Sequence, residues 1–288
     1  MNKLTIQKGN RLYEIIIDKY KLIVGTNYDE KFEIIRSILR FYSNNKLSEY
    51  HIEKDGFLDL KMNDKSIKVK DLFIYHVNKY YSLQEDYKLT TKSLILKYLE
   101  TVLSDGSMND TIQTLNILFE SLSHEIGEES LIDGEFNDMI PKQLLKLFTP
   151  FFIEDGYKKD EFDFTIEEII ILQLNLIKRI VSNAIIKKSI IIVEINVLTK
   201  EIYEAILGFE NSMILVFVDE FKLVDIPVSN FFICNRILVD LASDENLYEK
   251  ICDNNFCLLT LEEGRDYMKN YLYKKDNNKT ALINKLLK

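Results

Sequence analysis

The sequence predicts an α/β fold with an additional helical subdomain, and three stretches carry this prediction. An apolar strand, a glycine turn and an amphipathic helix follow one another over residues 22–39, and a strand–helix–strand unit spans 189–218. Two long amphipathic helical patterns, with an insert between them, occupy most of 110–186. We therefore expect a discontinuous α/β core over residues 1–108 and 187–288, and a helical subdomain over residues 109–186.

The first stretch is typical of a phosphate-binding loop that lacks the residues needed to bind phosphate and magnesium. Its sequence, LIVGTNYDEKFEIIRSIL, keeps only Gly25 and Lys31 of the pattern G-x-x-x-x-G-K-[ST]. Glu30 replaces the second glycine and would repel phosphate, and Phe32 replaces the hydroxyl that holds magnesium. The prediction from this stretch is a degenerate phosphate loop whose strand–loop–helix architecture persists without a nucleotide. An ordinary strand–turn–helix with glycine in the turn is the alternative.

Periodicity and turn signals predict the remaining elements. Strands are expected at 3–7, 13–17, 21–24, 51–53, 57–62, 67–69 and 72–77, with a helix at 29–42 among them. Helices are expected at 91–103, 110–126 and 165–185, the last two packing on each other. The chain then returns to α/β structure, with buried strands at 190–193 and 213–218, a strand at 231–234, and helices at 199–208, 246–252 and 261–272.

Charged residues at two strand ends raise the question of enzyme chemistry. Glu194 and Ile195 follow the strand whose end, in a nucleotide hydrolase, carries a magnesium-binding Asp and a catalytic Glu, so ATP hydrolysis is disfavoured. Residues 219–222, Asp-Glu-Phe-Lys, contain the Glu-x-Lys spacing of some metal-dependent nucleases. No further positioned Asp stands out, and a solvated loop after a strand explains the pattern as well.

Two groups of charged residues are candidates for binding. Carboxylates that could share a hard cation such as calcium, or simply form a solvated face, are Glu125, Glu128, Glu129, Asp133, Glu135 and Asp138. Basic residues that could track DNA phosphates, or serve solubility, are Lys178, Arg179, Lys187, Lys188, Arg36 and Arg40.

Composition limits the partners and the compartment. The formal net charge of −9 gives no global attraction to DNA, so any DNA-binding surface must be local. Three cysteines without a C-x-x-C pair, and a start without an apolar segment, predict a cytoplasmic protein with reduced thiols and no membrane association.

The order of these pieces resembles the Csn-two family, the accessory adaptation proteins of type II-A CRISPR systems, and in particular its longer members. The resemblance covers most of residues 22–234. The stretches that carry it are the degenerate loop, KDLFIYHVNKYYSL, TIQTLNILFESLSHEIGEESLIDGEF with MIPKQLLKLF, TIEEIIILQLNLIKRIV, and SIIIVEINVLTKEIYEAILGFENSMILVFVDEFKLVDIP with FFIC. Residues 44–69 and the stretch after 246 look like additions to the shorter family pattern.

The resemblance implies a P-loop-like fold without ATPase activity, assembled as a homotetrameric ring. The ring would thread onto ends of linear double-stranded DNA during spacer acquisition, beside the CRISPR integrase and the RNA-guided effector nuclease. It also implies calcium, with Glu125, Glu128 and Glu129 as ligands, and a DNA surface that includes Lys178, Arg179, Lys187 and Lys188. The alternatives are a metal-dependent nuclease or ATPase, and a scaffold that binds only proteins.

Overall fold

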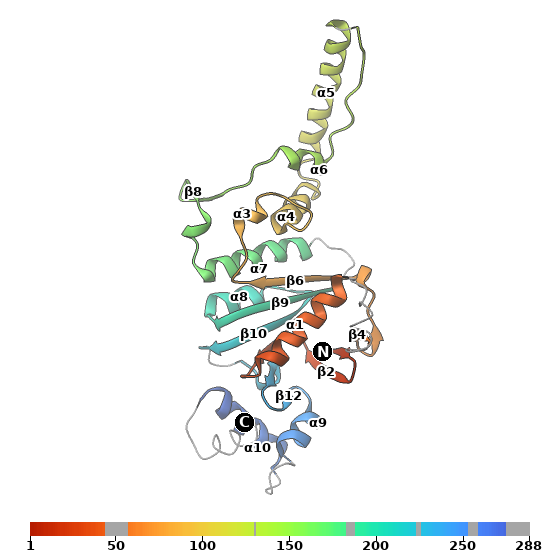
Figure 1. Ribbon diagram of the computed structural model, residues 1–288. Helices are drawn as coiled ribbons and strands as arrows, with labels where there is room; N and C mark the ends of the chain where they lie inside the picture. The colour runs from red at the N-terminus through yellow and green to blue at the C-terminus, as the bar shows by residue number, and fades with distance from the viewer. Residues whose placement is uncertain (44–56, 130, 183–187, 223–225, 253–258, 275–288) are drawn as a thin grey trace. The chain divides into compact units, whose positions relative to one another are not determined.

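The computed structural model describes residues 1–43, 57–129, 131–182, 188–222, 226–252 and 259–274 (Figure 1). The chain divides into two compact units. Unit 1 comprises Met1–Lys79 and Ile186–Lys288, and unit 2 comprises Tyr80–Ile185. Unit 1 is α/β and unit 2 is mainly helical. The predicted strand at 51–53 lies outside the described residues.

Unit 1 is built on a six-stranded mixed sheet of order β12-β11-β3-β10-β9-β6. All neighbours pair in parallel except β11 and β12, which are antiparallel. The central strands are continuous apolar runs, because a parallel sheet is covered on both faces. The strands are β3 (Tyr20–Val24), β6 (Leu72–Asn78), β9 (Lys188–Leu198), β10 (Ser212–Phe221), β11 (Phe231–Cys234) and β12 (Leu238–Asp240).

A second, antiparallel sheet in unit 1 has the order β2-β1-β4-β5. Strand β2 alternates between buried and more exposed residues, as expected when one face meets the core, whereas β1 has three consecutive buried residues at its centre. The predicted hairpin over 57–69 is shorter than expected, since a 3-10 turn at Val69–Asp71 follows its second strand. The strands are β1 (Asn2–Lys8), β2 (Arg11–Ile17), β4 (Leu58–Met62) and β5 (Lys65–Ser66).

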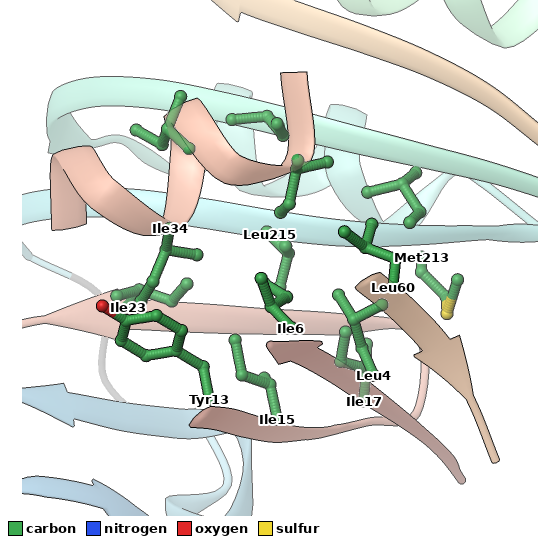
Figure 2. Close-up of a cluster of buried hydrophobic side chains, with 14 of the residues drawn as sticks. Leu4, Ile6, Tyr13, Ile15, Ile17, Ile23, Ile34, Leu60, Met213 and Leu215 are labelled. Atoms are coloured by element: carbon green, nitrogen blue, oxygen red, sulfur yellow. The ribbon is translucent and has the colours of Figure 1, made fainter. Parts of the chain in front are cut away.

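The core of unit 1 joins the two sheets through helix α1 (Tyr28–Ser43). Ile34 and Ile38 of α1 are fully buried in one cluster with side chains from both sheets. Figure 2 shows Ile34 among Ile6 and Ile15 of the antiparallel sheet and Leu215 of the six-stranded sheet. This packing fixes the position of α1, and with it the loop that precedes the helix.

Short helices complete unit 1. Helix α8 (Lys200–Leu207), capped by Thr199, connects β9 to β10. After β12 come α9 (Asp244–Leu247), a π-helical turn at Tyr248–Cys252 and α10 (Leu261–Leu272). Helix α10 begins with a capping box between Thr260 and Glu263.

Unit 2 contains three main helices, α4 (Leu94–Leu103), α5 (Asn109–Glu129) and α7 (Ile166–Ser182). The partner of α7 is α4, so the expectation that α5 and α7 pack on each other is wrong. Because α4 belongs with α7, the predicted boundary at residue 108 lies inside unit 2. The smaller elements are α3 (Leu83–Asp86), α6 (Pro141–Leu144), β7 (Phe152–Glu154) and β8 (Tyr157–Lys159).

A buried carboxylate organises the start of α4. Asp86 accepts hydrogen bonds from the backbone N–H groups of Leu94 (2.9 Å) and Ile95 (2.7 Å), and from the hydroxyl of Tyr81. Ser93 caps the same helix through the N–H of Leu96. These bonds satisfy N–H groups that an α-helix leaves free at its first turn. None of the helices in the described part of the chain is both long and apolar enough to span a membrane.

The start of α7 supplies a pH-dependent contribution to stability. Lys159, the backbone N–H of Thr165 and its hydroxyl, in that order, lower the pKa of Glu168 from 4.5 to about 2. The stabilisation is therefore complete above pH 4.5 and is lost as the pH falls toward 2. We expect Glu168→Gln to lower stability by a constant amount above pH 5, and by a shrinking amount below pH 4.5, in urea titrations. A difference that is independent of pH would contradict this assignment.

Candidate functional site

The candidate site lies at the carboxyl edge of the six-stranded sheet, where β3 leads into α1. After β3 the chain crosses to β6 at one edge of the sheet, and it later returns to β11, which pairs with β3 on the opposite side from β10. The strand order therefore reverses at β3, which makes it a topological switch point. Ligands of open α/β sheets bind at such points. Whether this site can hold a ligand depends on the length of its loop and on the polar groups that the loop leaves free.

The loop between β3 and α1 is only three residues long. Strand β3 ends at Val24 and α1 begins at Tyr28, so Tyr28, Asp29 and Glu30 are helical. The side chain of Asn27 accepts a hydrogen bond from the N–H of Glu30 (3.2 Å), as an N-cap residue does. In a phosphate-binding loop these residues would belong to the loop, whereas here they form the first turn of α1.

The N–H groups of Thr26 and Asn27 in this loop are bonded within the protein. Asn235, directly after β11, accepts a hydrogen bond from the N–H of Thr26 at 2.7 Å. The N–H of Asn27 donates to the carbonyl of Cys234 at 3.0 Å, and that of Lys31 donates to the carbonyl of Asn27 at 3.2 Å. Gly25 has a φ of 118°, and a Cβ there would lie 2.3 Å from the carbonyl oxygen of Cys234. The glycine is therefore required by the close approach of β11.

Lys31 is turned inward to the end of β10. Its ammonium donates to the carbonyl of Val218 (3.1 Å) and to the carboxylate of Asp219 (3.2 Å), and its side chain is only 7% exposed. A phosphate-binding lysine must instead point into the loop. The carboxylate of Asp219, which belonged to the candidate nuclease motif, is engaged by the same contact.

Glu30 ties α1 to the antiparallel sheet. The hydroxyl of Tyr13 on β2 donates to its carboxylate, and the guanidinium of Arg11 lies 3.4 Å away. One turn further on, Glu33 pairs with Lys8 of β1 at 2.6 Å. The position that a phosphate loop reserves for glycine therefore holds a side chain with a structural role. Phe32, at the hydroxyl position, is exposed and carries the guanidinium of Arg36 at 5.3 Å from its ring centroid.

The second acidic candidate, Glu194, lies inside β9, which continues to Leu198 instead of ending at the predicted residue 193. Its carboxylate is 3.0 Å from Nε2 of His76, and it pairs in register with Asn78 of β6. Nearby, Lys79 donates to the side chain of Asn196 at 3.1 Å. Within the described residues, no group of three or more His, Cys, Asp or Glu side chains is arranged to hold a metal ion. Burial raises the pKa of the Cys234 thiol to about 12, so it is not a nucleophile at neutral pH.

The candidate calcium ligands lie at the end of α5. Glu125 and Glu128 are exposed and are three residues apart on the helix. The side chain of Glu129 lies outside the described residues. Asp133, from the segment that follows, approaches α5 at Gly127, where a Cβ would lie 2.7 Å from its Oδ1.

The candidate DNA-binding residues fall on both units. Lys178 and Arg179 are exposed in the last turns of α7, and Arg179 forms an ion pair with Asp105. In unit 1, Arg36 and Arg40 are one turn apart on α1, and Lys188 opens β9. Lys187 lies outside the described residues.

Sequence reasoning missed the residues that fill the site. Asn235, Cys234, Tyr13 and Arg11 are the partners of the loop and of Glu30. One signal was available for Asn235, since a polar side chain directly after a buried strand lies at the ligand-binding edge of the sheet. Nothing in the local pattern indicates that Tyr13 faces Glu30.

The fold and site define a mixed α/β protein in which a switch-point loop is bonded internally. No protein-family model matches the sequence, and no curated protein matches it. Among solved structures, the chain is similar to the crystal structure of Stu0660 of Streptococcus thermophilus, with 15% identity and a TM-score of 0.70. The similarity covers 99% of this chain and 93% of that one. At this identity the comparison shows a shared fold.

Proposed function

We propose that this protein is a non-catalytic, sequence-independent binder of double-stranded DNA ends that acts in CRISPR spacer acquisition as a member of the Csn-two family. The observation that carries the proposal is the engagement of Lys31 with Asp219 and Val218, together with the internal bonding of the loop. In a nucleotide-binding protein this lysine would contact phosphate, whereas here it stabilises the fold. This supports a P-loop-like core that does not bind a nucleotide. The order of segments that resembles the family supplies the biological role.

The proposed DNA surface must be local, because the net charge is −9. It consists of Lys178 and Arg179 on α7, Lys187 and Lys188 at the start of β9, and Arg36 and Arg40 on α1. Lysines and arginines that contact phosphates bind without regard to sequence. In the proposed homotetrameric ring, these residues would line the inner surface.

Calcium is the proposed cofactor, with Glu125, Glu128 and Glu129 as its ligands. Two of these carboxylates are exposed and a turn apart, which suits a hard cation. The described residues do not assemble a ligand set of three, so no step of the function is derived through the ion. The proposed partners are the CRISPR integrase and the RNA-guided effector nuclease, and the proposed compartment is the cytoplasm.

Charge reversal of the basic surface tests DNA binding. Because each phosphate contact contributes a slope of about 0.9 to the dependence of log K on log salt, Lys178→Glu with Lys188→Glu should reduce the slope by roughly two contacts. The measurement is a fluorescence titration of linear duplex at several salt concentrations. Lys200→Glu, an exposed lysine on α8, is the control and should leave the slope unchanged. An unchanged slope in the double variant would remove both lysines from the DNA surface.

A second candidate function is a scaffold that binds only proteins. The net charge and the exposed apolar side chains of Leu118, Leu122 and Ile126 on α5 favour it. It predicts no DNA binding at physiological salt. The nuclease and ATPase alternatives predict turnover with magnesium or manganese, so the binding assays should also monitor DNA cleavage and phosphate release.

A further inference from the structure

Two adjoining pockets in unit 2 share Tyr87 and Phe148 in their walls. Their volumes are about 420 Å³ and 350 Å³, within the range of small-ligand sites. The larger, lined by five aromatic rings, is called the aromatic pocket, and the smaller, lined by three lysines, is called the lysine pocket. All of their lining residues belong to unit 2.

The aromatic pocket offers ring surfaces to a ligand. Phe148 is 50% and Phe151 49% exposed, so large parts of both rings are open to solvent. The rings of Tyr87 and Phe152 lie behind them, 6.1 Å apart between centroids. The five rings are those of Tyr87, Tyr98, Phe148, Phe151 and Phe152.

The lysine pocket offers positive charge. Lys88 pairs with Glu85 at 2.5 Å, whereas Lys142 and Lys146 are exposed and form no ion pair within the described residues. Among the described residues that line the two pockets, none is an aspartate or a glutamate. In a chain of net charge −9, this local excess of positive charge suits an anion that also has an aromatic or apolar part.

Two local features near the shared wall also favour a ligand. The hydroxyl of Tyr87 is buried, and its hydrogen has no acceptor within the described residues, which is costly for a buried polar group. Leu89 in the lysine pocket has a φ of 47°, a strained conformation for a bulky side chain, and such strain is concentrated at binding sites. A ligand that brings a hydrogen-bond acceptor would supply the bond that Tyr87 lacks.

We propose that the two pockets bind an unpaired nucleotide strand at a DNA end. Bases would stack on Phe148 and Phe151, and phosphates would face Lys142 and Lys146. Open rings beside basic side chains are the combination that binds single strands without sequence preference. The five rings favour a nucleotide strand over an acidic peptide, because every base has a π-face whereas a peptide offers one only at its aromatic residues.

This inference rests on the proposed function, since it identifies a feature that distinguishes a DNA end from the interior of a duplex. Inside a duplex the bases are paired and stacked, so extruding one costs free energy. An unpaired overhang offers its bases without this cost. The pockets would therefore favour linear DNA whose ends carry unpaired bases.

Fluorescence anisotropy with three labelled probes tests the inference. The probes are an oligothymidine, a blunt duplex, and the same duplex with short thymidine overhangs. The wild-type chain should bind the overhang duplex about tenfold more tightly than the blunt duplex, because stacking of one base contributes a factor of roughly this size. Phe148→Ala should remove this advantage and weaken oligothymidine binding by a similar factor, with the affinity for blunt duplex unchanged.

A second variant tests the phosphate contacts. Lys142→Glu with Lys146→Glu should also remove the overhang advantage, and should lower the salt slope for oligothymidine by about 0.7 for each lost contact. The matched controls are Phe162→Ala, at an 85% exposed ring of unit 2 that lines neither pocket, and Lys200→Glu in unit 1. Both controls should bind all three probes as the wild-type chain does.

Equal binding of the blunt and overhang duplexes by the wild-type chain would overturn the inference. An overhang advantage that persists in both pocket variants would also overturn it. Binding of a peptide of alternating glutamate and phenylalanine, without binding of oligothymidine, would instead indicate a protein partner. The oligothymidine probe contains no duplex, so a loss of duplex binding alone would contradict the proposed function and leave this inference standing.

Discussion

Replacing Asp240 with alanine is expected to destabilise unit 1 by about 3–5 kcal/mol, because it leaves a buried lysine without its counter-charge. Asp240 pairs with Lys21 of β3, and the two side chains are 2% and 0% exposed. Asp240 also accepts hydrogen bonds from the N–H of Ile16 (2.6 Å) and of Ala242 (2.8 Å). The pair thus joins β2, β3 and the end of β12. Burial lowers the pKa of Lys21 although Asp240 opposes this, as expected where desolvation dominates.

Urea unfolding at neutral pH measures this effect. The control is Glu14→Ala, which breaks the solvent-exposed pair between Glu14 and Lys3 and should cost about 1 kcal/mol or less. The double variant Lys21→Met with Asp240→Leu should recover much of the lost stability, because it removes both charges. A loss below about 1 kcal/mol for Asp240→Ala would show that water reaches Lys21.

Replacing Lys31 with alanine is expected to lower the stability of unit 1 by about 2–4 kcal/mol, and to leave the response to nucleotide unchanged. The alanine removes a buried aliphatic chain and leaves the carbonyl of Val218 without its donor. In a phosphate-binding loop, the same change would chiefly remove ATP-dependent stabilisation. Thermal unfolding with and without ATP and magnesium distinguishes the two cases.

Lys31→Met is the matched variant, because it keeps most of the aliphatic chain and should lose roughly half as much stability. The wild-type chain should show no shift in melting temperature with ATP. A nucleotide-dependent shift that disappears in Lys31→Ala would contradict a structural role for this lysine.

The periodicity of apolar residues predicted most helices and strands of the fold. It did not predict which of these elements pack against one another. The amphipathic pattern of α5 identified its apolar face correctly, but such a pattern does not indicate which element covers that face. The structure packs α4 on α7, and within its described part it leaves Leu118, Leu122 and Ile126 of α5 exposed. The same limit explains the boundary, which was placed at residue 108 although α4 belongs to unit 2.

At the candidate site, the altered motif can be recognised in the sequence, but the residues that contact it cannot. Glu30 and Phe32 are visible as departures from the phosphate-loop pattern, and Gly25 lies in the turn as expected. The three-residue loop depends on Asn27 as a helix cap. The inward position of Lys31 depends on Asp219, which is 188 residues away in sequence. Such long-range pairs leave no local pattern.

A mobility-shift titration at near-physiological salt is the most direct test of whether the protein binds double-stranded DNA ends without catalysis. The titration compares linear duplex with covalently closed circular DNA of the same sequence, with calcium and with chelator. We expect binding to linear DNA only, loss of binding on chelation, and no cleavage when magnesium or manganese is added. Equal binding to both DNA forms, or no binding to either, would contradict it.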